Sequence, residues 1–142
     1  MADRSVALYR AVVATVLVVE DDDDAAEVMG HALRKAGFRV FTAPNGRAAL
    51  SLLLGGGIDL VVTDLRMPEM DGVSLVAVMR SYLRFKSMPV IVFTAFAEDR
   101  GGDELRRLGV REVFRKADAD LAELVRAVGR HLAPPTPTEC AN

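Results

Sequence analysis

The chain has 142 residues, of which 51% are hydrophobic and 27% are charged, and its formal net charge is −2 at pH 7. These values are typical of one folded domain and disfavour both a disordered chain and a membrane protein. The weak net charge provides no basic field for direct nucleic-acid binding. The one cysteine, Cys140, rules out an internal disulfide framework and indicates a reducing compartment, the cytoplasm.

An apolar run at 11–19 is the first element of the chain that predicts structure. The run is too short to cross a bilayer, which takes roughly 20 residues. Acidic residues follow at 20–24, where a signal peptide would have small residues and a cleavage site. We therefore interpret the run as a buried first strand.

Five short runs rich in β-branched residues follow one another along the chain: TVLVVE, FRVFT, IDLVVTD, PVIVFTA and REVFRK. Three of them are apolar at successive positions, at 16–19, 60–62 and 90–93. Uninterrupted apolar runs are typical of strands covered on both faces, as in a parallel sheet.

Segments with helical periodicity separate these runs. In the first segment, Asp24 and Glu27 have the spacing of a capping box, and Gly37 is expected to end the helix. Its predicted apolar stripe consists of Ala25, Val28, Met29, Ala32, Leu33 and Ala36. The other helices are predicted at 47–54, 73–83, 103–108 and 121–132. Such alternation indicates βαβ units with right-handed crossovers.

The chain is expected to contain one domain at 15–133, between an N-terminal extension at 1–14 and a tail at 134–142. The tail, PPTPTECAN, is rich in proline and threonine and is predicted to be disordered. No internal repeat and no second domain are predicted.

Polar residues stand where four of the predicted strands end. Glu20 and Asp21 follow the first strand, Asp64 the third, Thr94 the fourth and Lys116 the fifth. In open parallel sheets, ligands bind at the edge where the carboxyl ends of the strands lie. Adjacent carboxylates repel one another unless a cation lies between them. Oxygen ligands of this kind suit Mg²⁺. A carboxylate beside such a metal can attack phosphorus, with a hydroxyl and an ammonium stabilising the transferring oxygens. The pattern predicts phosphoryl transfer to Asp64.

Each of these residues also has a structural interpretation. Asp22, Asp23 and Asp24 are better explained as helix caps, a lone threonine is often a cap, and a lone lysine is usually a solvated charge. The occurrence of suitable acids, a hydroxyl and an ammonium at all four strand ends favours the functional interpretation. His31 and His131 are interpreted as structural or surface residues, because no Cys or His partners stand at metal-binding spacing.

The residues at 15–133 resemble the receiver domain of bacterial two-component response regulators. The resemblance rests on VLVVEDD, DLVVTDLRMPEMDG, VIVFTA and EVFRK, which occur in the family's order. It implies a flavodoxin-like α/β fold, with five parallel strands in the order 2-1-3-4-5 and five helices in three α/β/α layers. It also implies a phosphoacceptor rather than an enzyme, one that at most catalyses its own phosphorylation and dephosphorylation.

The resemblance assigns roles to individual residues. Asp64 corresponds to the phosphoacceptor, Thr94 to the switch hydroxyl and Lys116 to the lysine that pairs with the phosphoryl group. The donor would be a phosphohistidine on a sensor histidine kinase or a histidine phosphotransfer protein. Phosphorylation would remodel the surface of the fourth helix, fifth strand and fifth helix, which would bind an unidentified downstream protein. A homodimer would use the face from the fourth helix to the fifth strand.

The same resemblance implies a Mg²⁺ site, which Mn²⁺ could also occupy. Glu20 and Asp21 correspond to the acidic pair, and Asp64 and the backbone carbonyl of Arg66 would complete the protein ligands. Arg66 and Phe96 are expected to flank the phosphoryl group and to influence its lifetime. Glu69 and Asp71 are interpreted as turn and cap residues rather than ligands.

Two residues depart from the family pattern. Ala117 follows Lys116 where the family usually has proline, so the preceding peptide bond is expected to be trans or strained. Val113 stands where the family often has an aromatic residue that turns inward on activation, and Phe114 is expected on the opposite face of the strand.

These departures leave a second hypothesis, a pseudo-receiver scaffold that acts without a phosphorylation-driven switch. A third is a Mg²⁺-dependent phosphatase that works through an aspartyl phosphate. Such enzymes need a second aspartate two residues after the nucleophile, where this chain has Arg66, so the sequence disfavours the third hypothesis.

Overall fold

A computed structural model of the chain describes residues 13–95 and 99–132. The predicted extension up to residue 12, Phe96, and the predicted tail with Cys140 lie outside the described residues, and the domain bounds remain a prediction. Within the described ranges, no helix combines the length and the hydrophobicity that a membrane-spanning helix requires.

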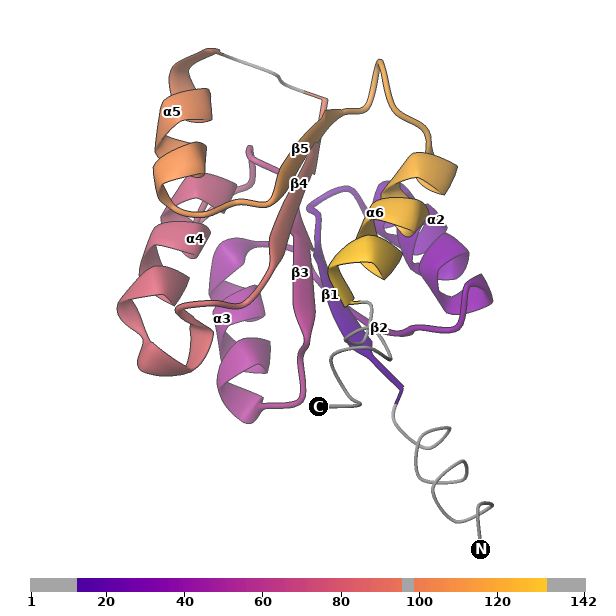
Figure 1. Cartoon of the computed structure of the whole chain (residues 1–142), viewed down its shortest axis with the longest axis horizontal. Helices are drawn as coiled ribbons and strands as arrows, with labels where there is room; N and C mark the ends of the chain where they lie inside the picture. The colour runs from indigo at the N-terminus through magenta and orange to yellow at the C-terminus, as the bar shows by residue number, and fades with distance from the viewer. Residues whose placement is uncertain (1–12, 96–98, 133–142) are drawn as a thin grey trace, which may run out of the picture.

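The fold is a parallel five-stranded sheet between two layers of helices (Figure 1). The strand order is β2-β1-β3-β4-β5, which confirms the order 2-1-3-4-5 and the flavodoxin-like class. Helices α2 and α6 cover one face of the sheet, and α3, α4 and α5 cover the other. The elements are β1 (Thr15–Val19), α2 (Asp23–Lys35), β2 (Arg39–Ala43), α3 (Gly46–Gly55), β3 (Leu60–Thr63), α4 (Gly72–Ser81), a 3-10 turn (Leu83–Phe85), β4 (Val90–Thr94), α5 (Asp99–Arg107), β5 (Glu112–Arg115) and α6 (Leu121–Leu132).

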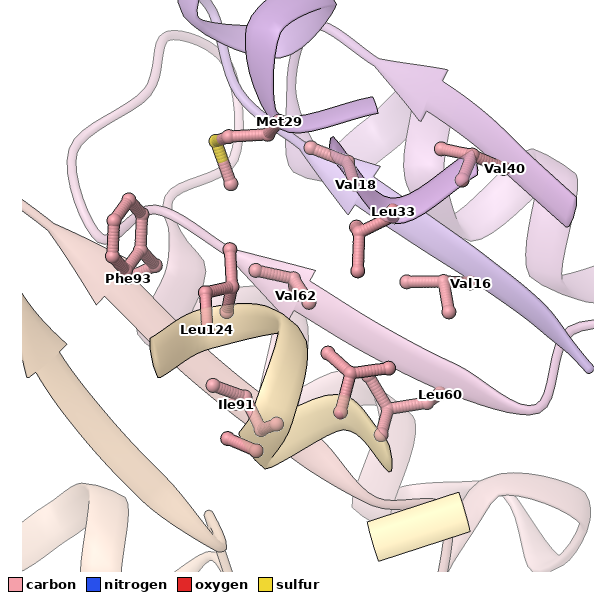
Figure 2. Packing of buried hydrophobic residues seen from close by; sticks show 12 residues of the cluster. Val16, Val18, Met29, Leu33, Val40, Leu60, Val62, Ile91, Phe93 and Leu124 are labelled. Carbon is pink, nitrogen blue, oxygen red and sulfur yellow. The ribbon is translucent and has the colours of Figure 1, made fainter. Parts of the chain in front are cut away.

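The central strands are covered on both faces, as their apolar runs predict. Every residue of β1, β3 and β4 is buried. Because successive strand residues point to opposite faces, Val16 and Val18 enter the core beneath α2 and α6, which Figure 2 shows. Leu17 and Val19 enter the second core beneath α3 and α4.

The first helix is capped by one of the three aspartates that the sequence analysis interprets as caps. Asp22 is the N-cap, whereas the predicted capping box at Asp24 does not form, and the Asp22 side chain accepts hydrogen bonds from the backbone N–H groups of Asp24 and Ala25 at 3.0 and 3.1 Å. The predicted apolar stripe is therefore only partly correct. The buried residues of α2 are Ala26, Met29, Gly30 and Leu33, whereas Val28 is 53% exposed.

Two further helix boundaries differ from the predicted ones. The predicted helix at 73–83 ends at Ser81, because Tyr82 adopts an extended conformation before the 3-10 turn. The predicted helix at 103–108 begins earlier, at Asp99, and ends at Arg107. The last helix has its predicted bounds, Leu121–Leu132.

Candidate functional site

Three carboxylates converge at the edge of the sheet where the strands end. The parallel pairing of β1 with β3 places Val19 opposite Thr63, and the backbone N–H of Asp64 continues this ladder to the carbonyl of Val19 at 3.0 Å. The next residues of both strands are thereby neighbours. One carboxylate oxygen from each of Glu20, Asp21 and Asp64 lies within 4.8 Å of the others, so the acids meet as predicted.

Two of these carboxylates are buried. Glu20 is 3% exposed and Asp64 is 6% exposed, whereas Asp21 is exposed. Burial raises the pKa of Glu20, and the negative charge of Asp64 raises it further, while the hydrogen bond from Lys116 opposes the shift. The donor set consists entirely of oxygen atoms with a surplus of negative charge. Such a set fits a hard divalent cation of the Mg²⁺ class.

Thr94 and Lys116 complete the site from β4 and the end of β5. The hydroxyl of Thr94 donates a hydrogen bond to Oδ1 of Asp64 at 2.7 Å. The ammonium of Lys116 donates to Oε1 of Glu20 at 2.6 Å and lies 4.0 Å from Oδ2 of Asp64. Lys116 therefore reaches the predicted site, but its nearest carboxylate is that of Glu20.

The loop after Asp64 is held by contacts that the motif alone did not reveal. The backbone N–H of Leu65 donates to Oδ1 of Asp64 at 2.7 Å, and the backbone N–H of Gly72 donates to the carbonyl of Leu65 at 2.9 Å. A Cβ atom at Gly72 would collide with the backbone oxygen of Asp64. Glycine at this position lets the start of α4 pack directly against the site.

The interpretation of the two later acids in this loop is confirmed. Glu69 adopts a left-handed conformation with φ of 67° and accepts a hydrogen bond from the side-chain amide of Asn45 at 2.9 Å. Asp71 is the N-cap of α4 and accepts from the backbone N–H of Ser74 at 2.8 Å. These bonds account for both side chains as turn and cap residues.

The two departures from the family pattern lie in β5 and directly after Lys116. Val113 is 47% exposed, and Phe114 packs against the core beneath α2 and α6, which confirms that the two side chains occupy opposite faces of β5. The described residues contain no cis peptide bond, so the Lys116–Ala117 bond is trans.

The histidines lie away from this edge. His31 is exposed on α2, and Nε2 of His131 lies 2.7 Å from Oε2 of Glu112, which also pairs with Arg130 at 2.6 Å. His131 thus belongs to a polar cluster that joins the end of α6 to the start of β5. Sequence reasoning did not identify this cluster.

A groove of about 710 Å³ opens next to Lys116, between the first turns of α2 and α6. Val28, Phe93 and Leu121 contribute apolar side chains to the groove, and Asp24 contributes a carboxylate. The exposed side chain of Val28 therefore belongs to a concave surface that adjoins the acid cluster.

Comparison with known families shows to which family this fold belongs. The family model of the response regulator receiver domain matches residues 16–129. The chain belongs to the response regulator receiver domain family. This is a family of receiver domains in two-component signalling and not a family of classical enzymes.

Curated relatives include both a small protein and much longer regulators. An uncharacterized 14.6 kDa protein of Leptolyngbya boryana is 35% identical over 116 residues, which cover 82% of this chain and 88% of the relative. The regulatory protein AtoC of Escherichia coli is 37% identical over 111 residues, covering 78% of this chain. The receiver domain spans only 24% of AtoC.

Solved structures with this fold include chemotaxis protein CheY4 of Vibrio cholerae. CheY4 is 27% identical with a TM-score of 0.79, and the match covers 85% of this chain and all of CheY4. Response regulator TrrA of Thermotoga maritima is 28% identical with a TM-score of 0.74, and the match covers 84% of this chain and all of TrrA. The TrrA structure is a complex with Mg²⁺ and BeF.

Proposed function

We propose that the domain accepts a phosphoryl group on Asp64 from a phosphohistidine of a sensor histidine kinase or a histidine phosphotransfer protein. The observation that carries the proposal is the convergence of three carboxylates with the Thr94 hydroxyl and the Lys116 ammonium. This set supplies a nucleophile, a metal site and two groups that can bind phosphoryl oxygens.

The contacts of Asp64 distinguish its two carboxylate oxygens. Oδ1 already accepts hydrogen bonds from the Thr94 hydroxyl and the Leu65 N–H, whereas Oδ2 faces the Lys116 ammonium at 4.0 Å. Oδ2 therefore attacks phosphorus. The new O–P bond forms as the P–N bond to the donor imidazole breaks, and the imidazole leaves with the electron pair and takes up a proton. Lys116 neutralises charge on the transferring oxygens.

Glu20, Asp21 and Asp64 would hold Mg²⁺, with the backbone carbonyl of Arg66 as the fourth protein ligand. The bound cation would supply positive charge that offsets the repulsion between the acids and the incoming phosphoryl oxygens. The burial of Glu20 supports this assignment, because a buried carboxylate is costly to keep charged without a cation beside it.

The phosphoryl group would act on the rest of the domain through Thr94 and Lys116. Both side chains now bond to carboxylates, and a phosphoryl group on Asp64 would offer them stronger acceptors. Moving these residues would shift the surface formed by α5, β5 and α6, where an unidentified downstream protein would bind. The apolar groove beside Lys116 would be available to the donor protein.

Acetyl phosphate with Mg²⁺ tests the acceptor role directly. The wild-type protein should gain the mass of one phosphoryl group, and Asp64→Asn should gain none. Asp23→Asn is the matched control, because Asp23 is an exposed acid of α2 outside the metal cluster. Wild type without a phosphoryl adduct, or an adduct that survives in Asp64→Asn, would contradict the proposal.

A pseudo-receiver scaffold remains the second candidate, and the exposed Val113 in place of an inward-turning aromatic favours it. Beryllofluoride with Mg²⁺ separates the two candidates by nuclear magnetic resonance. A phosphorylation switch predicts shifted signals at Asp64 and also along α5, β5 and α6. Shifts confined to the residues around Asp64 would support the scaffold.

A further inference from the structure

A second polar site lies at the opposite edge of the sheet from Asp64. A cavity of about 440 Å³ is bounded by the end of α4, the segment before β4 and the connection from α5 to β5. Figure 1 shows α4 and α5 side by side on the same face of the sheet. The cavity lining includes the cations Arg80, Lys86, Arg107 and Arg111, together with Ser87 and Leu108.

Arg80 is fixed in place by backbone carbonyls from two separate segments. Its Nε donates to the carbonyl of Leu108 at 2.7 Å, and its Nη1 donates to the carbonyls of Phe85 and Met88, both at 2.8 Å. Burial lowers the pKa of Arg80, and the nearby charge of Arg111 lowers it further. The cavity therefore has a preorganised guanidinium at its base.

None of the described residues that line the cavity is acidic. In the described part of the chain, no carboxylate forms an ion pair with Arg80, Lys86, Arg107 or Arg111. Arg106, the neighbour of Arg107 on α5, lies outside the lining and pairs with Asp103 at 3.5 Å. Four like charges thus share one concavity, and no carboxylate of the described side chains pairs with them, so an anion would relieve their repulsion.

The shape and chemistry of the cavity favour a small ligand. Its volume lies in the range of small-molecule sites, roughly 300–1,000 Å³. Guanidinium groups match phosphate oxygens in two-point hydrogen bonds, and the Ser87 hydroxyl can donate another. Lys86, Arg107 and Arg111 are exposed, so they can close on a ligand that enters from solvent.

We propose that this cavity binds a small molecule with two or more linked phosphate groups. Linked phosphates carry enough negative charge, over a sufficient length, to contact cations from α4, α5 and the connection between α5 and β5 together. The bound ligand would connect the end of α5 to the segment before β4. This site is independent of phosphoryl transfer, and its failure would leave the proposed role of Asp64 intact.

Titration with inorganic pyrophosphate tests the proposal, using protein stripped of divalent cations so that the acid cluster contributes no metal-mediated binding. Amide resonances of Ser87, Leu108 and Gly109 should shift, whereas those of Asp64 and Leu65 should not. Calorimetry should show that Arg107→Gln weakens binding about tenfold, the loss expected for one charge-assisted hydrogen bond. Arg106→Gln removes the same charge from the next residue and should change the affinity less than twofold.

Arg111→Gln and Arg115→Gln form a second matched pair, because Arg115 pairs with Asp118 at 3.3 Å and lies outside the cavity lining. Arg111→Gln alone should weaken binding about tenfold. Equal weakening in both members of either pair would overturn the proposal, because a general surface field would then explain the binding. Inorganic phosphate that binds as tightly as pyrophosphate would overturn the requirement for linked phosphates. Duplex DNA that displaces pyrophosphate at lower concentration would overturn the assignment of a small ligand.

Discussion

The two edges of the sheet concentrate opposite charges and stabilise them differently. At the strand ends, Glu20 and Asp64 are buried beside Asp21, with the ammonium of Lys116 bonded to Glu20. At the strand starts, Arg80 is held by uncharged backbone carbonyls, and Arg111 adds a second positive charge. Among the described residues, each edge has a surplus of one sign of charge, which a ligand of opposite sign would stabilise.

We call the edge at the strand ends the acidic edge and the edge at the strand starts the basic edge. The largest effect on stability is expected at Gly72, where the acidic edge has no space for a side chain. Gly72→Ala places a methyl group against the backbone oxygen of Asp64, so the loop that carries Asp64 must move. We expect a loss of about 3 kcal/mol in the free energy of unfolding, measured by urea denaturation, and much slower phosphorylation by acetyl phosphate.

Gly129→Ala is the control for this change. Nothing lies within 4 Å of a Cβ atom at Gly129, which is inside α6. The substitution should stabilise the protein by about 0.5–1 kcal/mol. Equal destabilisation by both variants would show that the collision with the backbone oxygen of Asp64 is not the cause of the loss in Gly72→Ala.

Removal of the central cation should have the largest effect at the basic edge. Arg80→Met leaves the carbonyls of Phe85, Met88 and Leu108 without their side-chain donor, and we expect a loss of about 2 kcal/mol. Arg84→Met is the control, because exposed Arg84 makes one long hydrogen bond of 3.4 Å. If urea denaturation shows the same loss of stability for both variants, the hydrogen bonds of Arg80 stabilise the fold no more than the single bond of Arg84.

A divalent cation should stabilise the acidic edge selectively. Mg²⁺ at ten times its dissociation constant should stabilise the wild-type protein by about 1.4 kcal/mol through mass action. Thermal unfolding should show most of this gain lost in Asp21→Asn and retained in Asp23→Asn, because Asp21 belongs to the acid cluster. The same gain in all three proteins would place the cation elsewhere.

The smallest effect concerns the cluster that joins β5 to α6. Burial disfavours the charged form of Glu112, but hydrogen bonds from Arg130 and His131 outweigh this effect and lower its pKa. A lowered pKa stabilises the folded state above the unfolded pKa, and this contribution is lost as the pH falls through the folded pKa. Glu112→Gln should cost about 1 kcal/mol at pH 7. Urea denaturation at several pH values measures this cost. A difference in the free energy of unfolding between Glu112→Gln and wild type that persisted below the lowered pKa would contradict this assignment.

The acidic edge was largely predictable from the sequence because its residues follow recognisable strands. Parallel pairing then brings Glu20, Asp21 and Asp64 together without further information. The sequence offers several aspartates as the cap of α2, because four of them follow one another, and only the backbone geometry selects Asp22.

The basic edge could not be predicted in the same way. The acceptors of Arg80 are backbone carbonyls of Phe85, Met88 and Leu108, and every residue type carries such a carbonyl. The role of Gly72 was also hidden, because its close approach to Asp64 depends on how α4 packs. These contacts require the tertiary arrangement and leave no local pattern.

The bond between Lys116 and Glu20 joins residues that are 96 positions apart, which has a consequence for the order of folding. The acids come from β1 and β3, so they can assemble before β5 joins the sheet. Closing the longer loop costs more conformational entropy. We therefore expect a partly folded intermediate, in which β5 has not yet joined the sheet, to contain the acid cluster but not the ammonium of Lys116. Salt should stabilise this intermediate more than the native state, and synthesis of the chain would complete the site only when its last strand is in place.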